Sequence, residues 1–329
     1  MRASVEAGSR KREARGGKAI RNSLLAIVGP TAVGKTALSL HLAETLDGEI
    51  VSADSRLFYR GMDIGTAKPT SEERARVPHH LIDIANPDAT VGLAEFQEQA
   101  LAAITDVHAR GKLPLLVGGT GQYVRAVVEG WRIPRVPPDP DLRAELEAQA
   151  EREGGGALHT RLAQLDPVAA QRIDPRNVRR VIRALEVCLV TGRPISEQQR
   201  KQPPPYHIFQ VGLTMERADL YARADRRVEA MMDAGLEGEV RQLVRAGYGW
   251  NLPAMSGLGY AQFRPYFEAQ ASLEEVAVEI KRATHRFIRR QYNWFRLNDP
   301  HIRWFDVSQA ETTAEIETSV SGWLEEKHA

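Results

Sequence analysis

Residues 29–36 are the part of this sequence whose residue types and spacing are best suited to chemistry. They match the phosphate-binding pattern G-x-x-x-x-G-K-[ST] and comprise Gly29, Pro30, Thr31, Ala32, Val33, Gly34, Lys35 and Thr36. In such a loop the backbone N–H groups surround a phosphate at the N-terminus of a helix, and the lysine adds a positive charge. The Thr36 hydroxyl can bind Mg²⁺. The loop therefore predicts a site for a diphosphate or a triphosphate.

The segments around this loop predict how it is positioned. Residues 24–28 form an unbroken apolar run, typical of a buried strand, and residues 37–46 favour a helix. Two further strands are predicted: residues 50–53, which end at Asp54, and residues 113–117, which are followed by Gly-Gly-Thr120. Ligands of parallel sheets bind at the carboxyl ends of the strands. We therefore expect Asp54 and Thr120 to converge on the phosphate-binding loop.

Asp54 has three possible roles on the sequence alone. Enzymes that hydrolyse nucleoside triphosphates commonly carry an aspartate near Mg²⁺ at a strand end. The best candidate strand, residues 113–117, ends in glycine instead, which leaves Asp54 as the acidic residue at a strand end. Its carboxylate could serve as a general base or associate with Mg²⁺, and a helix cap is a third alternative.

Alternating strand and helix patterns predict an α/β fold, a P-loop NTPase-like parallel sheet wrapped by helices. Proline-rich segments at 134–140 and 203–205 divide the chain. We assign residues 23–134 and 206–329 to the core domain, with a returning strand at 208–214 and helices from about 220 and about 273. Residues 135–205 are predicted to form an all-α insertion domain, in which a helix begins at Asp174-Pro175 and ends at Gly192. Residues 1–22 are predicted to be a disordered basic tail.

Composition limits the class of protein. The 329 residues are 43% hydrophobic and 26% charged, which is typical of a globular protein, and no apolar run approaches the roughly 18 residues of a membrane helix. The single cysteine, Cys188, is expected to be packed, and it favours a cytoplasmic location. His79 and His80 are adjacent and lack partners at metal-binding spacing, so core or hydrogen-bonding roles are expected for them.

Arginine-rich helix faces raise the prospect of a polyanionic partner. They occur within the insertion, at 176–183, and within the last long predicted helix, at 282–290. Arg223 and Arg227 lie one helical turn apart and could reach the phosphate-binding loop, or could instead pair with Asp225 and Glu229. The glycine-rich residues 61–69 follow Asp54 closely, which favours a loop that faces the substrate.

Several segments together resemble the tRNA dimethylallyltransferase family. They are the loop at 29–36, Ser-Ala-Asp-Ser at 52–55, Tyr-Arg-Gly-Met-Asp-Ile-Gly-Thr-Ala-Lys-Pro at 59–69, Val-Pro-His-His-Leu-Ile-Asp at 77–83, Val-Gly-Gly-Thr-Gly at 117–121 and Arg-Ala-Leu-Glu-Val at 183–187. The resemblance extends from about residue 24 to about residue 305. Departures from the family pattern are His285 in place of an arginine and Val91-Gly92 in place of Tyr-Ser.

The resemblance implies transfer of a dimethylallyl group from its diphosphate to the exocyclic amine of adenosine 37 of tRNA, beside the anticodon. In that reading the loop holds a leaving diphosphate, Asp54 is the general base, and Thr120 assists the reacting centre. Lys35, Thr36 with Mg²⁺, and Arg223 or Arg227 stabilise the diphosphate. The residues expected to contact tRNA are Asp54, Ser55, Arg56, Leu57, Thr120, Arg143, Arg179, Arg180, Val181, Ile182 and Arg183.

Two alternatives remain from the residues themselves. A small-molecule or nucleotide kinase would share the loop and the core, and a non-catalytic RNA-binding ATP switch would bind RNA without forming a product. The expected partners are tRNA and dimethylallyl diphosphate, with no membrane, and the protein is expected to be a monomer.

Overall fold

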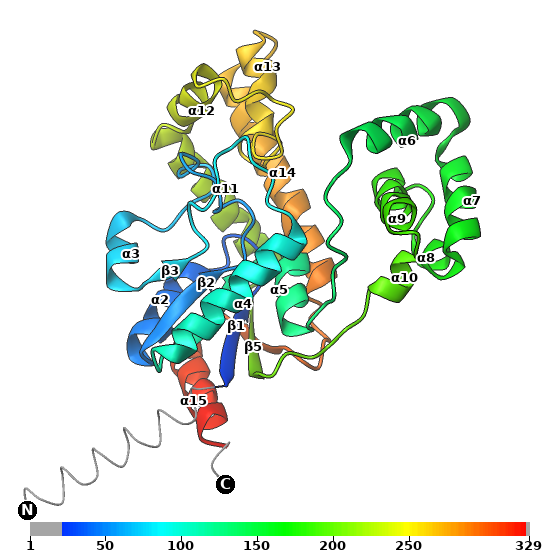
Figure 1. Cartoon of the computed structure of the whole chain (residues 1–329). Coiled ribbons are helices and arrows are strands. Elements are labelled where there is room, and N and C mark those ends of the chain that lie inside the picture. The colour runs from blue at the N-terminus through cyan, green and yellow to red at the C-terminus, as the bar shows by residue number, and fades with distance from the viewer. Residues whose placement is uncertain (1–21, 327–329) are drawn as a thin grey trace, which may run out of the picture. The chain divides into compact units, whose positions relative to one another are not determined.

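The computed structural model describes residues 22–326, so the predicted tail lies outside the described residues except for its last position. Six strands form one sheet in the order β3–β2–β4–β1–β5–β6, and every neighbouring pair is parallel (Figure 1). The strands are β1 (Ser23–Val28), β2 (Gly48–Ser52), β3 (His79–His80), β4 (Leu113–Gly118), β5 (His207–Thr214) and β6 (Arg303–Asp306). The predicted α/β class is confirmed.

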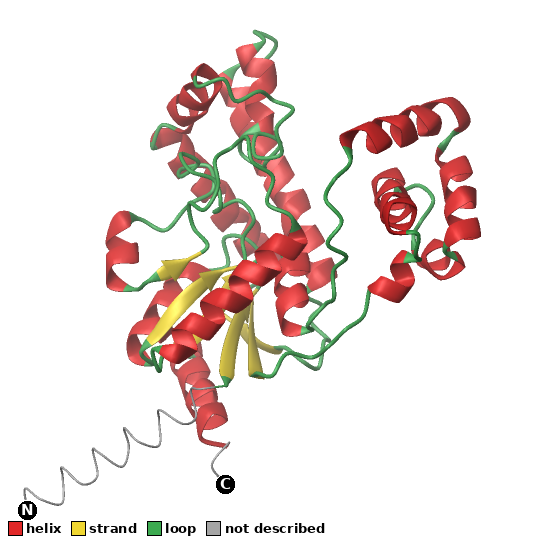
Figure 2. Cartoon of the chain, viewed as in Figure 1, coloured by secondary structure: helices red, strands yellow, loops and turns green. Residues whose placement is uncertain are grey.

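Helices surround this sheet (Figure 2). They are α2 (Lys35–Thr45), α3 (Ser71–Arg76), α4 (Leu93–Ala109), α5 (Gly121–Val128), α11 (Arg217–Asp233), α12 (Leu236–Arg245), the 3₁₀ helix η1 (Ala261–Phe263), α13 (Arg264–Phe267), α14 (Leu273–Trp294) and α15 (Thr312–Glu325). All six residues of β1 are buried, as expected for a central parallel strand covered on both faces. Its Leu25 and Ile27 share an apolar cluster with residues of α2 and α15, so the sheet is the centre of the core.

The strand register aligns the carboxyl ends of β1, β2 and β4, which lead into the phosphate-binding loop, Asp54 and Thr120. Val28 at the end of β1 pairs with Gly118 at the end of β4, and Ser52 at the end of β2 pairs with Val117. The four longer strands match the predicted ones. The sequence analysis missed β3, which has only two residues, and β6, which has four with mixed exposure.

The described chain divides into two compact units, one containing the sheet and one comprising residues 128–204. The second unit consists of α6 (Pro140–Glu153), α7 (Gly155–Leu165), α8 (Pro167–Arg172), α9 (Val178–Thr191) and α10 (Ile195–Gln198). Residues of these helices form a separate apolar core that includes Cys188, which is packed as expected. Almost all of the segment assigned to an insertion, 135–205, falls in this unit.

The predicted start of one helix in this unit was wrong. The helix α9 begins at Val178, and the Asn177 side chain caps it by accepting a hydrogen bond from the Arg180 N–H. Asp174 instead accepts hydrogen bonds from the backbone and side chain of Arg176 in a local turn. Aspartate stabilises such a turn and a helix N-terminus by the same kind of bond, so the sequence did not distinguish them.

No helix in the described part of the chain is both long enough and apolar enough to span a membrane.

Candidate active site

The phosphate-binding loop joins β1 to α2 and has the backbone conformation that the motif requires. Gly29 and Gly34 have φ angles of 142° and 111°, and Ala32 between them also has a positive φ, 65°. A Cβ atom on Gly29 would lie 2.6 Å from the Leu213 carbonyl oxygen, so only glycine fits where the loop passes β5. The N-terminus of α2 has no side-chain cap and no acidic residue in its first turn. Its N–H groups can therefore bind an anion.

Lys35 lies at the first position of α2 and folds back over the loop. Its Nζ donates hydrogen bonds to the carbonyl oxygens of Gly29, at 3.0 Å, and Pro30, at 2.7 Å. Burial lowers the pKa of Lys35 from 10.5 to about 8; the nearby Asp54 opposes this shift, and Arg227 adds to it. A polyanion bound in the loop would favour the protonated lysine.

Asp54 follows β2 and is half-buried. Its Oδ1 accepts a hydrogen bond from the Arg56 N–H at 3.0 Å, and residues 55–58 form turns. No helix begins there, so the helix-cap alternative was wrong. Asp54 counteracts the lowering of the pKa of both Lys35 and Arg227, so its carboxylate lies near these two cations.

Thr120 reaches the same edge of the sheet from β4. The two glycines before it lie very close to the ends of β2 and β1. A Cβ atom on Gly118 would lie 2.4 Å from the Ala53 carbonyl oxygen, and one on Gly119 would lie 3.3 Å from the Gly29 carbonyl oxygen. The two glycines therefore allow the ends of β1, β2 and β4 to meet. The structure brings together the loop, Asp54 and Thr120, as expected from the parallel strands.

Arg223 and Arg227 on α11 complete the charged part of the site. A Cβ atom on Gly34 would lie 3.6 Å from Arg223 Nη2, so this guanidinium lies against the loop. Burial lowers the pKa of Arg227. The negative charge of Asp54 opposes this lowering, and the positive charge of the neighbouring Arg223 adds to it. Lys35 and Arg227 thus lie near the Asp54 carboxylate, Arg223 lies against the loop, and this excess of positive charge suits a diphosphate.

The alternative ion pairs considered for these arginines do not form. Asp225 accepts a hydrogen bond from the His285 ring at 2.9 Å, and Glu229 pairs with Lys281 at 2.6 Å. His285 therefore connects α14 to α11.

An aromatic stack lies next to Thr120. Tyr123 lies in the first turn of α5, where its N–H donates to the Thr120 carbonyl, and its ring stacks on Phe96 with centroids 4.4 Å apart. Phe58 continues the stack at 5.8 Å from Tyr123. Burial raises the pKa of Tyr123 to about 12, so it stays neutral. Phe58 and Phe96 are 1% and 0% exposed, so the stack is mostly buried and only Tyr123 is half-buried.

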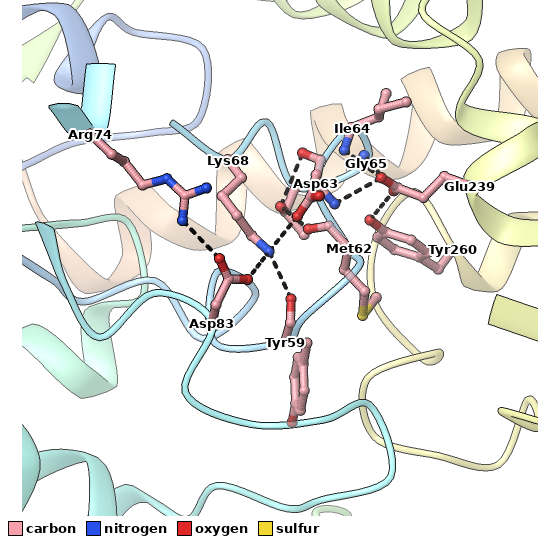
Figure 3. A network of polar contacts seen from close by, with 11 residues as sticks. Tyr59, Met62, Asp63, Ile64, Gly65, Lys68, Arg74, Asp83, Glu239 and Tyr260 are labelled. Atoms are coloured by element: carbon pink, nitrogen blue, oxygen red, sulfur yellow. Dashed lines mark hydrogen bonds and ion pairs between the residues drawn. The ribbon is translucent and has the colours of Figure 1, made fainter. Parts of the chain in front are cut away.

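The 59–69 segment is held by a buried ammonium group (Figure 3). Lys68 Nζ donates to the Tyr59 carbonyl oxygen at 2.8 Å and to Asp63 Oδ1 at 2.6 Å. It also binds Asp83 Oδ1 at 2.5 Å, and Arg74 binds the other oxygen of that carboxylate at 2.8 Å. Because the Lys68 side chain is 2% exposed, these partners are needed to keep its charge in the interior.

A second anchor of this segment is Glu239 on α12. Its carboxylate accepts the backbone N–H groups of Asp63 at 2.8 Å, Ile64 at 2.7 Å and Gly65 at 3.1 Å (Figure 3). The Tyr260 hydroxyl donates to the same carboxylate at 2.6 Å. The 59–69 segment, which we expected to face the substrate, is therefore hydrogen-bonded to α12 through Glu239.

The residues expected at tRNA differ in their surroundings. Ser55, Arg56 and Leu57 are half-buried in the turns after Asp54, and Arg56 Nη1 donates to the Pro253 carbonyl at 3.0 Å. In the second unit, Arg179 and Arg180 are exposed on α9.

Val181 and Ile182, also expected at tRNA, lie instead in the apolar core of the second unit. They are 0% and 4% exposed, so their side chains pack the helix and the expected contact is corrected. The two residues follow the exposed arginines in sequence but turn to the opposite face of α9.

Arg143 and Arg183 share a buried carboxylate. Arg143 binds both oxygens of Glu186, at 2.8 and 2.9 Å, and Arg183 binds one of them while donating to the Val136 carbonyl at 3.0 Å. Burial acts to raise the pKa of Glu186, but the hydrogen bonds from Arg143 and Arg183 hold it below its usual value. The two arginines are thereby held in fixed orientations.

The histidines have the hydrogen-bonding roles expected for them. A ring nitrogen of His79 lies 2.7 Å from the Val77 carbonyl, and one of His80 lies 2.8 Å from Glu49. Within residues 22–326 no three histidine, cysteine or acidic side chains are grouped so that they could hold a metal ion.

The sequence analysis missed Gln291, a buried residue of α14 that touches both the phosphate-binding loop and the segment before Thr120. It lies on the same face of the helix as Ile280, Thr284 and Ile288, all of them buried. A long polar side chain on a largely apolar helix face is the signal that could have revealed it.

Comparison with known proteins identifies relatives over most of the chain. The model of the IPP transferase family matches residues 57–298. A tRNA dimethylallyltransferase of Roseiflexus castenholzii is 66% identical over 273 residues, which is 83% of this chain and 89% of the relative. One of Chloroflexus aggregans is 62% identical over 275 residues, 84% of this chain and 93% of the relative.

Solved structures give the same result. A tRNA isopentenylpyrophosphate transferase from Bacillus halodurans is 45% identical, with a TM-score of 0.70 over 93% of this chain and 98% of that one. A eukaryotic dimethylallyltransferase, described as acting on tRNA, is 26% identical with a TM-score of 0.78, covering 90% of this chain and 77% of that one.

Proposed function

The chain belongs to the IPP transferase family, and we infer from this membership that it transfers a dimethylallyl group from dimethylallyl diphosphate to tRNA. The acceptor is the exocyclic amine of adenosine 37, beside the anticodon, and diphosphate is released. The observation that carries this function is the meeting of the phosphate-binding loop, Asp54 and Thr120 at one edge of the sheet. A diphosphate site, a carboxylate and a hydroxyl are the groups that the transfer needs.

The charges of the site fit a leaving diphosphate. As the bond between the allylic carbon and the diphosphate oxygen breaks, negative charge grows on the diphosphate. Lys35 and Arg223 lie against the loop, with Arg227 nearby, and the three stabilise that charge. The ring of Tyr123, which is half-buried and close to Thr120 in the chain, is proposed to contact the hydrocarbon part of the substrate.

Asp54 acts as the general base on the amine. The exocyclic nitrogen of adenine is a weak nucleophile, because its lone pair is conjugated with the purine ring. Its nitrogen forms the new bond to the allylic carbon while its proton passes to the Asp54 carboxylate. The Arg56 N–H bond to Oδ1 orients that carboxylate. Thr120, at the adjacent strand end, assists the reacting centre.

We propose Mg²⁺ as the cofactor, with Thr36 as its protein ligand. Thr36 lies exposed in the first turn of α2, and Gly118 occupies the end of β4, where a further carboxylate would be. Mg²⁺ commonly binds through few protein groups together with substrate phosphates and water, which fits this donor set. The ion would neutralise part of the diphosphate charge.

Binding of tRNA is proposed to use the arginines of the second unit. Arg179 and Arg180 are exposed and suit phosphates, while Glu186 orients Arg143 and Arg183. The target base has to leave its stack, which costs a few kcal/mol and less in a single-stranded loop. The monomeric state and the cytoplasmic location remain predictions.

The test is to incubate the protein with unmodified tRNA, Mg²⁺ and dimethylallyl diphosphate and to measure the mass of the tRNA nucleosides. One added dimethylallyl group on a single adenosine of the anticodon loop is the expected result. ATP in place of dimethylallyl diphosphate is the control, since phosphoryl transfer or ATP hydrolysis would support the kinase or the ATP switch. If the folded protein forms no prenylated nucleoside, the proposal is refuted.

A further inference from the structure

Gln291 connects two parts of the active site that are far apart in the sequence. Its Oε1 accepts a hydrogen bond from the Thr31 N–H of the phosphate-binding loop at 2.8 Å. Its Nε2 donates to the carbonyl oxygen of Gly119, directly before Thr120, at 3.1 Å. The side chain is therefore a bridge of one carboxamide between the loop that binds the diphosphate and the strand end that carries Thr120.

Both the oxygen and the nitrogen of the Gln291 carboxamide are hydrogen-bonded, and the side chain is buried. Gln291 is 4% exposed, so each of its polar atoms would be costly without a partner. A Cβ atom on Gly119 would lie 2.2 Å from Nε2, so the absence of a side chain at 119 leaves the space that the bridge occupies. The carboxamide of glutamine provides both an acceptor and an N–H donor, and asparagine, which has the same group, is shorter by one methylene.

The contact with Thr31 also constrains the phosphate-binding loop itself. The Thr31 N–H points to Gln291, which directs that amide away from the diphosphate. The next residue, Ala32, has a positive φ of 65°, a conformation that is unfavourable for alanine unless its surroundings hold it. The hydrogen bond to Thr31 is placed to stabilise this turn. Nothing in the mechanism proposed above uses Gln291 directly.

We propose that Gln291 is a positioning residue, which keeps the diphosphate loop and the Thr120 segment at a fixed separation. This inference rests on the proposed function. In the transfer, the diphosphate leaves from one side of the allylic carbon while the amine attacks near Asp54 and Thr120, so the two halves of the site have to be aligned. A displacement of about 1 Å in such an arrangement can lower a rate by roughly 10²-fold.

The experiment compares Gln291→Glu and Gln291→Met with the unaltered protein across a range of pH. A protonated glutamic acid is close in shape to glutamine and supplies one acceptor and one O–H donor, whereas its ionised form places a negative charge against the Gly119 carbonyl. Burial raises the pKa of such a carboxyl. We expect kcat/KM for dimethylallyl diphosphate in Gln291→Glu, relative to the unaltered protein, to rise about tenfold per pH unit as the pH falls, until the carboxyl is protonated.

Gln291→Met is the matched variant, because methionine has a similar length and no hydrogen-bonding group of comparable strength. We expect a loss of roughly 10²-fold in kcat/KM at every pH, with the Kd for tRNA unchanged. If the variants instead lose activity because a fraction of the molecules is unfolded, the remaining folded molecules are normal. In that case kcat falls, KM for dimethylallyl diphosphate is unchanged, and Gln291→Glu does not recover at low pH. That outcome overturns the inference, as does full activity of Gln291→Met. An unaltered protein that makes no prenylated tRNA would instead refute the proposed function.

Discussion

The lowered pKa of Lys35 predicts how the affinity for dimethylallyl diphosphate depends on pH. In the free protein burial sets this pKa at about 8, and a bound diphosphate should raise it. Below pH 8 Lys35 is already protonated, so the Kd should be constant. Above pH 8 binding has to take up a proton, and the Kd should rise about tenfold per pH unit. If the complex restores the usual value of 10.5, the total loss is about 300-fold, from 1.36 kcal/mol per pKa unit.

Calorimetric titration without tRNA measures this effect directly. Comparing two buffers with different ionisation enthalpies gives the number of protons taken up, expected to be about 0.5 at pH 8 and about 0.9 at pH 9. The diphosphate itself titrates below this range, because its last pKa is near 6. Lys35→Met should bind weakly and lose the proton uptake. A constant Kd from pH 7 to about 9.5, with no proton uptake, would contradict the placement of a partly neutral lysine in the loop.

Three further predictions concern the base, the tRNA surface and the 59–69 segment. Asp54→Ala should lower single-turnover rates by roughly 10²–10⁴-fold while the Kd for tRNA is unchanged; a normal rate would remove Asp54 from the mechanism. Replacing Arg179 and Arg180 by alanine should reduce the slope of log K for tRNA against log salt by about one unit per lost phosphate contact, and an unchanged slope would mean that both are only solvated. Glu239→Ala leaves three backbone N–H groups without their acceptor and should lower the free energy of unfolding in urea by about 2–4 kcal/mol. Glu237→Ala, which breaks only a surface pair with Arg241, should cost less than about 1 kcal/mol, and equal losses would contradict the anchoring role of Glu239.

Much of the site could be predicted because its parts are local. The motif at 29–36 contains its own glycines, lysine and hydroxyl, and the apolar run before it already indicates a strand. The rule for parallel sheets then led to the expected convergence of Asp54 and Thr120, which the pairing of Val28 with Gly118 and of Ser52 with Val117 provides.

Other features depended on which face of a helix is buried or where a helix begins, and here the expectations from the sequence were wrong. Val181 and Ile182 stand next to the arginines in sequence, yet the turn of α9 directs them into the core. Asp174 resembled a helix start, but Asn177 provides the cap three residues later.

The sequence by itself determined the phosphate-binding loop, the α/β class and the family, because these depend on short segments and on the order of strands and helices. Only the tertiary structure decided that Arg223 and Arg227 face the loop and that Gln291 joins Thr31 to Gly119. Each of these relations links residues that are about 170 or more positions apart in the chain, and such pairs meet only when the helices pack on the sheet. Sequence spacing constrains neighbours along the chain, whereas packing selects which distant side chains share a buried space.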